Sequence, residues 1–158
     1  MDITLGQNLA SIVRYIQENS APGTKLYFDE IPECFFVPSI YFQVPVTSGQ
    51  RATLRSYGTA TIMNMWFMEA KDWDAHMRAE EMRDSIMLGN CEVPVVDKSG
   101  QDTGRTLRVT PPETRRVDEG IVQLSFSFKV YFHPEKGVAK VQRLHVAWQE
   151  AKKLIDRR

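Results

Sequence analysis

Few side chains in this sequence are spaced in a way that could perform catalysis or hold a metal ion. His76 and Glu80 lie four residues apart, which places them on one face of a helix, where they could form a ligand pair or a base and an acid. A zinc-protease helix needs a second histidine four residues after the first and a glutamate beside the first. The segment from His76 to Glu80 (HMRAE) has neither, so we interpret it as a solvated helix surface and predict no metal and no cofactor.

The two cysteines, Cys34 and Cys91, are the other candidates for chemistry. A cysteine acts as a nucleophile when a histidine lies beside it in space, but neither has a local signature, and a free cysteine usually behaves as a small apolar residue. The first residues show no basic leader before an apolar run, so we expect no signal peptide, synthesis in a cytoplasm and reduced thiols. We predict that the protein is not an enzyme. A small hydrolase or acyltransferase that uses one cysteine is the alternative.

Basic residues could instead contact nucleic acid. Four arginines flank a polar loop: Arg105, Arg108, Arg115 and Arg116. Acidic residues are interleaved with them and no aromatic stacking platform accompanies them, so we interpret the cluster as solvated or as salt-bridge partners between subunits. The 20 lysines and arginines are balanced by 20 aspartates and glutamates, which argues against a protein dedicated to nucleic acid or membrane surfaces. A nucleic-acid-binding module that uses these arginines stays open as an alternative.

Two helices are predicted in the first part of the chain. Apolar residues recur at spacings of three and four from Leu5 onward, after a capping box formed by Thr4 and Gln7. This helix should end near Asn19, before a Ser-Ala-Pro-Gly turn. A second helix should open at residues 72–74 and end at Gly89 or Asn90, with one buried stripe: Ala75, Ala79, Met82 and Ile86.

Strands are predicted between and after these helices. Residues 25–29 form a short strand, and residues 34–43 form another that lies at an edge or carries a bulge because Pro38 interrupts it. A loop follows at 45–50. The strand at 55–68 is apolar on both faces, so we expect it to be central and covered on both sides.

The second half of the chain is predicted to be mainly strand. Short strands at 91–96 and 107–110 enclose a polar turn region. The strand at 122–132 alternates apolar and polar residues, which is typical of a half-buried antiparallel strand.

The C-terminal residues carry a narrow apolar seam at helical spacing: Val141, Leu144, Trp148, Ala151 and Ile155. Such a seam could dock on its own domain or on a neighbouring subunit, and residues 138–146 also fit an extended conformation. The order of the elements predicts a single α+β domain over residues 1–158, with a mostly antiparallel sheet and helices packed on one face. Residues 138–158 are a candidate inter-subunit arm.

Several segments together resemble the tail terminator family of tailed phages and prophages of Gram-positive bacteria. The resemblance rests on hydrophobic spacing and segment order over almost the whole chain, carried by five segments: KLYFDEIPECFFVPSI, NMWFMEAKDWDA, AEEMRDSI, GIVQLSFSFKVYFHPE and LHVAWQEA. None of these is a catalytic signature. The resemblance therefore implies a structural role.

Such proteins are expected to form a ring, typically hexameric, at the head-proximal end of the tail tube. The resemblance implies that the ring stops tube polymerisation and provides the surface for a head-completion or neck protein, with a sheath protein as a further partner if the tail is contractile. DNA would only pass through the lumen, no membrane would be involved, and the protein would be assembled in the host cytoplasm into the virion. Candidate subunit contacts are Leu144 and Trp148 in the seam, and Arg105 and Arg108 beside the polar loop. Another neck or head-completion (connector) protein is the nearest alternative.

Overall fold

The computed structural model describes residues 4–133 of the 158-residue chain. These residues form helix α1 (Leu5–Glu18), helix α2 (Asp72–Leu88) and eight strands: β1 (Lys25–Tyr27), β2 (Ser39–Phe42), β3 (Val46–Thr53), β4 (Ser56–Met68), β5 (Glu92–Val96), β6 (Asp102–Arg108), β7 (Glu113–Asp118) and β8 (Ile121–Phe132). The predicted α+β class is confirmed. The predicted C-terminal seam, including Leu144 and Trp148, lies outside the described residues.

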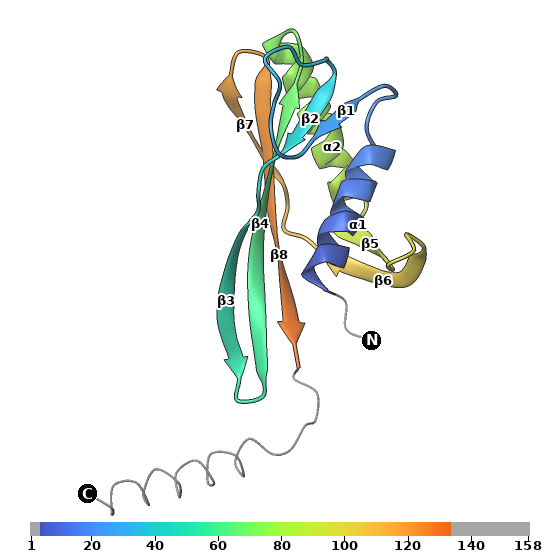
Figure 1. Ribbon diagram of the computed structural model, residues 1–158, viewed down its shortest axis with the longest axis vertical. Helices are drawn as coiled ribbons and strands as arrows, with labels where there is room; N and C mark the ends of the chain where they lie inside the picture. Colours follow the sequence, from blue (N-terminus) through green and yellow to red (C-terminus); the bar gives the residue numbers. More distant parts are fainter. Residues whose placement is uncertain (1–3, 134–158) are drawn as a thin grey trace, which may run out of the picture.

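The main sheet has six strands in the order β1-β2-β4-β8-β7, with β3 added to β4. All neighbouring strands run antiparallel except β1 and β2, which are parallel. β2 and β3 share one edge of β4: β2 pairs with residues 65–68 and β3 pairs with residues 56–62. The long β4–β8 pair is therefore the spine of the sheet, and its far half carries only β3 (Figure 1).

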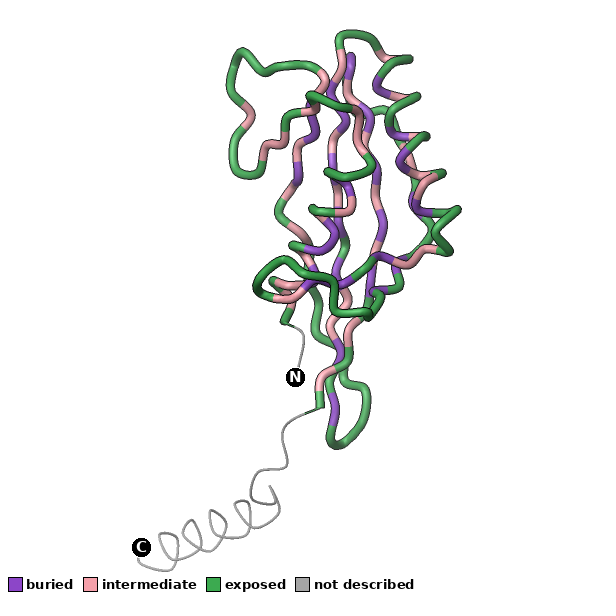
Figure 2. The backbone as a smooth tube through the Cα atoms, turned by 90° about the vertical axis from the view of Figure 1, so that its right-hand side faces the viewer, coloured by how far each residue is buried: buried purple, intermediate pink, exposed green. Residues whose placement is uncertain are grey.

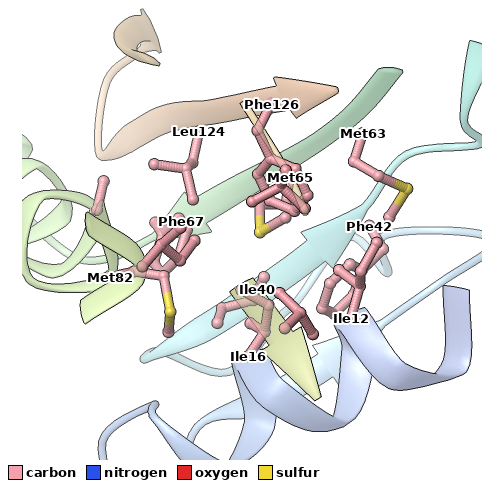
Figure 3. Packing of buried hydrophobic residues seen from close by; sticks show 14 of the residues in the cluster. Ile12, Ile16, Ile40, Phe42, Met63, Met65, Phe67, Met82, Leu124 and Phe126 are labelled. Atoms are coloured by element: carbon pink, nitrogen blue, oxygen red, sulfur yellow. The ribbon is translucent and has the colours of Figure 1, made fainter. Parts of the chain in front are cut away.

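The two helices and the β5–β6 hairpin lie on one side of the sheet, as the sequence predicted for the helices (Figure 1). Ile12 and Ile16 of α1 and Met82 of α2 point toward the sheet residues Met65 and Phe67 in the core (Figure 3). The buried residues concentrate in the half of the molecule that the helices cover (Figure 2). The far half of the sheet is a ribbon that extends beyond this core.

Both helices begin and end where their sequences predict. Thr4 and Gln7 form the reciprocal capping box of α1, and Asn19 is its C-cap. Helix α2 ends at its C-cap Gly89 and buries the predicted stripe. Ser11 of α1 adds a contact that the apolar pattern did not predict, because its Oγ accepts a hydrogen bond of 2.9 Å from the Val96 amide in β5.

Four predictions about the strands are wrong. The return strand expected at 107–110 begins inside the predicted polar turn region and is strand β6, Asp102–Arg108. Most of the expected loop at 45–50 belongs to strand β3, whose backbone is paired with β4 although all its residues are exposed and most are polar. The strand expected at 34–43 is confined to Ser39–Phe42; Pro38 precedes it, and β2 lies inside the sheet because β1 covers its outer side. β4 is central, but only one of its faces is covered along its length: Thr61, Met63 and Met65 are buried. On the other face Ile62 is 45% exposed, and burial is confined to the ends, as at Met68.

The predicted antiparallel strand near the C-terminal end of the described chain is confirmed as β8. Its even-numbered residues from Val122 to Phe128 are buried in the core, and the polar residues between them are partly exposed. The neighbouring strand β7 was not predicted, because its six residues (ETRRVD) are mostly charged and exposed. β7 forms because β8 offers a free edge, and charged side chains are typical of edge strands.

Candidate interaction surfaces

His76 and Glu80 are both half-buried on α2, with 42% of the His76 side chain and 18% of the Glu80 side chain exposed, so the predicted fully solvated surface is wrong for Glu80. The closest nitrogen–oxygen distance between His76 and Glu80 is 4.0 Å. The Glu80 carboxylate also pairs with Arg83 and accepts a hydrogen bond of 2.6 Å from the Thr114 hydroxyl of β7. The Glu80 side chain therefore connects α2 to the edge strand β7 of the main sheet.

The two cysteines are free thiols in different environments. Cys34 is exposed in the connection between β1 and β2, and Cys91 is half-buried after α2, with its Sγ 3.6 Å from Met87 Sδ. Within residues 4–133, no three His, Cys, Asp or Glu side chains gather in a way that could hold a metal ion. Neither of the two described helices is long and apolar enough to cross a bilayer.

The four arginines that are close in the sequence are divided between two sheets. Arg105 and Arg108 lie on β6 of the two-stranded sheet, and Arg115 and Arg116 lie on β7 of the main sheet. Arg108 pairs with Glu92 of the adjacent strand at 3.2 Å. The arginines therefore do not form a single patch for nucleic acid. The role of Arg105 and Arg108 in subunit contacts stays a prediction.

The junction between α2 and the β7–β8 turn is closely packed. The Gly120 amide donates to Asp72 Oδ1 at 2.6 Å, and the Gly120 carbonyl accepts from the Glu69 amide at 2.9 Å. The hydrogen bond from Gly120, with help from Arg116 at 2.9 Å, holds the pKa of Asp72 below its usual value. Partial burial raises the pKa of Glu69, against the attraction of Arg78.

The face of the main sheet opposite the helices carries one row of large side chains across five strands. Strand pairing places Tyr27 opposite Tyr41, Tyr41 opposite Trp66, Trp66 opposite Gln123, and Gln123 opposite Arg115. Paired residues share a face, and the residues that alternate with this row are those buried under the helices. The row is therefore on the face that no described element covers.

Hydrogen bonds hold the middle of this row in place. Trp66 Nε1 donates to Gln123 Oε1 at 3.1 Å, and Gln123 Nε2 donates to Ser125 Oγ at 2.9 Å. Ser125 Oγ in turn donates to Asn64 Oδ1 at 2.7 Å, and the Tyr41 ring meets the edge of Trp66. An aromatic ring with a fixed polar edge is typical of protein–protein contact surfaces.

A hairpin formed by β3 and the first half of β4 projects from the domain (Figure 1). All eight residues of β3 are exposed, and Leu54 in the turn is 91% exposed. Val44 and Val46 add further exposed apolar surface along it, and the Tyr57 ring stacks on Phe132 of β8. Residues 44–57 contain two basic residues, Arg51 and Arg55, and no acidic residue.

The connection between β1 and β2, residues 28–38, has the opposite charge. It contains Asp29, Glu30 and Glu33 and no basic residue. None of the three carboxylates has an ion-pair partner among the residues that the structure describes. Phe28 stacks on Phe42, while other apolar side chains of the connection are exposed: Phe35, Phe36 and Val37.

Sequence reasoning found these surfaces only in part. It expected residues 55–68 to be covered on both sides, which placed Trp66 on a covered face, and it interpreted the first strand of the hairpin as a loop. The signal for the hairpin was the run of mostly polar residues around Gly49, which separates two segments rich in β-branched and aromatic residues. The row across five strands depends on register, which no single segment contains.

Comparison with known proteins indicates a prophage relationship. No family model matches the chain. The chain is 27% identical over 132 residues to "Uncharacterized protein YqbJ" of Bacillus subtilis (strain 168), an alignment that covers 83% of this chain and 90% of that protein. It is 26% identical over 110 residues to "Phage-like element PBSX protein XkdJ" of the same organism, covering 68% of this chain and 75% of that protein. The chain is thus similar to a protein of a phage-like element.

Proposed function

We propose that this protein is a structural component of a phage or phage-derived particle, and that it acts as the tail terminator. In this role, copies of the chain form a ring, six-fold in the family that the sequence resembles, on the head-proximal end of the tail tube. The ring stops tube polymerisation and presents a surface to a neck or head-completion protein. The similarity to a protein of the phage-like element PBSX supports the particle, and the segment order supports the terminator role.

The observation that carries this proposal is the projecting β3–β4 hairpin. A strand stabilises a domain by burying side chains as well as by backbone pairing, yet β3 buries none of its eight side chains. The hairpin instead exposes Leu54, Val44 and Val46 to water. Leu54 lies in the turn, and Val44 and Val46 lie at the base of the hairpin. Exposed apolar side chains at both ends support the hairpin as a surface for assembly.

The open face of the sheet supports the same conclusion independently. The row from Tyr27 to Arg115 spans five strands without a covering layer among the described elements. Its centre, Trp66, is oriented by the hydrogen bond to Gln123. Aromatic residues and arginine are the types enriched where proteins bind one another. A ring subunit needs at least two such surfaces, since each copy contacts two neighbours and the tube.

The test is the mass of the purified protein by size-exclusion chromatography with light scattering, alone and with the tail tube protein from the same genome. We expect a species of six times the 18.2 kDa chain mass, or binding at one end of the tubes in electron micrographs. A strict monomer that ignores tubes would refute the terminator role. Binding to a neck or portal component instead of tubes would assign the protein to another position in the particle.

A matched pair of variants connects the assembly to the hairpin. Leu54→Asp changes a side chain that is 91% exposed in the hairpin, and Leu88→Asp changes one that is 86% exposed at the end of α2. Neither change removes a buried contact, so both variants should keep the wild-type circular dichroism spectrum. We expect only Leu54→Asp to lose the assembled species. Equal loss in both variants would show that the hairpin is not the specific surface.

A further inference from the structure

The basic hairpin, residues 44–57, and the acidic connection, residues 28–38, lie at different ends of the same sheet. The hairpin turn precedes Ser56 at one end of β4, whereas β2, which follows the acidic connection, pairs with residues 65–68 at the other end. At roughly 3.3 Å per residue, nine to twelve residues of strand separate them by about 30–40 Å. The hairpin turn lies at the lower end of the molecule, and β1 and β2 lie in its upper half (Figure 1). One copy therefore presents the two segments to different neighbours.

The two segments carry opposite charges, and both expose apolar side chains. Residues 28–38 carry three carboxylates without a base, and residues 44–57 carry two guanidinium groups without an acid. Arg51 and Arg55, like the carboxylates, have no ion-pair partner among residues 4–133. Each segment also exposes apolar side chains, such as Phe36, which is 67% exposed, and Leu54. An apolar centre with opposite charges around it is the composition of a specific protein contact.

The acidic segment is held in a defined shape before any contact. Its Phe28 ring stacks on Phe42 at 5.2 Å between centroids. The Phe36 amide donates to the Tyr27 hydroxyl at 3.3 Å, and Lys25 Nζ lies 4.5 Å from the centre of the Phe36 ring. A segment that is already ordered loses less conformational entropy when it binds.

We propose that the hairpin turn of one copy, with Leu54, Arg51 and Arg55, docks on the acidic segment 28–38 of the next copy. This contact deepens the proposed function and rests on it, because it is the head-to-tail contact from which a ring is built. A head-to-tail contact needs two unlike, complementary patches on one chain, and it closes into a ring when the rotation between neighbouring copies divides a full turn. The occupant of each patch is a second copy of this chain, because the chain itself carries both halves.

Cross-linking tests which segments meet. The acidic segment already contains an exposed cysteine, Cys34. In a Cys91→Ser background, Leu54→Cys places a second thiol in the hairpin turn, and a short bismaleimide links the two thiols without an oxidant. Because every copy would be linked on both sides, we expect a ladder of covalent trimers and larger species up to the size of the ring. A pattern that stops at dimers would overturn the proposal, since a two-fold contact gives only dimers.

Matched controls show whether the ladder reports the contact. Leu88→Cys in place of Leu54→Cys moves the thiol to an equally exposed leucine on α2, and it should give no ladder. Adding Cys34→Ser to the Leu54→Cys protein should also abolish the ladder. A ladder in either control would overturn the assignment of these two segments.

Charge exchange tests the electrostatic part of the contact. Arg51→Glu with Arg55→Glu makes the hairpin acidic, and Asp29→Lys with Glu33→Lys makes the connection basic. Each double variant alone should assemble at least about tenfold more weakly, because like charges then face each other. An equimolar mixture of the two should assemble again, with the two variants alternating around the ring. Failure of the mixture to recover would refute the proposed pairing.

The controls for charge are exposed residues elsewhere in the fold. Lys98→Glu in the β5–β6 turn and Glu119→Lys in the β7–β8 turn change the charge by the same amount per residue, and assembly should be unchanged. If the wild-type protein forms a ring but the ladder and the mixture fail, this contact is wrong and the terminator role stands. If the ladder and the mixture succeed but the ring ignores tubes, the contact is right and the terminator role is wrong. If no ring forms with or without tubes, both are wrong.

Discussion

Gly120 occupies a position in the β7–β8 turn that no other residue type should tolerate. Its φ of 69° lies in the left-handed region, and a Cβ built there would lie 2.3 Å from the Glu69 carbonyl oxygen. The same residue donates to Asp72 and accepts from the Glu69 amide. Gly120→Ala should therefore strain the turn and push the start of α2 away from the sheet.

The expected loss of stability has two parts. A non-glycine residue in the left-handed region costs about 1–2 kcal/mol. The clash is with backbone, which must shift, and loss of the hydrogen bond between the Gly120 carbonyl and the Glu69 amide costs about 0.5–1.5 kcal/mol more. Together the free energy of unfolding should fall by about 1.5–3.5 kcal/mol.

Gly100→Ala is the matched control. Its φ is 82°, but nothing lies within 4 Å of the position of its Cβ, so only the cost of the backbone conformation applies, about 1–2 kcal/mol. The free energies of unfolding of both variants can be measured by urea titration, followed by tryptophan fluorescence and circular dichroism at one protein concentration. The difference between the variants then reports the clash together with the hydrogen bond that it breaks.

Equal destabilisation by the two substitutions would refute this reasoning. It would mean that the Glu69 carbonyl does not approach Gly120 as closely as the structure shows. A loss for Gly120→Ala that is smaller than for Gly100→Ala would be a stronger contradiction, because the crowded site would then be the more tolerant one.

Three further predictions concern the core and the start of α2. Ser11→Ala leaves the buried Val96 amide without its acceptor, so the free energy of unfolding should fall by about 1–3 kcal/mol; no change in a urea titration would contradict this. Leu124→Ala empties a site where the side chain is 0% exposed and should cost about 2–5 kcal/mol in the same assay. The pKa of Asp72 is lowered mainly by the hydrogen bond from the Gly120 amide. It therefore contributes stability that is fully present above the ordinary aspartate pKa of 3.8 and is lost as the pH falls through the lower folded pKa. Asp72→Asn should therefore lose less stability than the wild type between pH 7 and pH 3, and an equal loss would show that this carboxylate does not titrate in the folded state as inferred.

Local sequence signals predicted the helices and one strand correctly. The capping box at Thr4, the stripe from Ala75 to Ile86 and the alternation along Val122–Phe132 each appear as predicted. Each signal is contained within one segment, because helix and strand periodicity set which side chains share a face.

The sequence allowed us to predict which residue types the candidate surfaces contain, but not how those residues are arranged. The strand that contains Trp66 was recognised as apolar on both faces, and the arginines were recognised as candidates for salt bridges. The sequence did not indicate that Trp66 faces outward in line with Tyr41 and Gln123. It also suggested one arginine cluster, whereas the strands place Arg108 and Arg116 in different sheets.

The sequence by itself thus determined the class of fold, the extent of both helices and the buried face of β8. Tertiary structure decided that residues 46–53 are a strand, that one face of β4 is open, and which side chains form the row across the sheet. The physical reason is that a helix forms all of its backbone hydrogen bonds within one segment, so its pattern is local. A strand forms its backbone hydrogen bonds with a neighbouring strand that can be distant in the chain. Whether the strand forms, its register and its exposed face are therefore decided only when the sheet assembles.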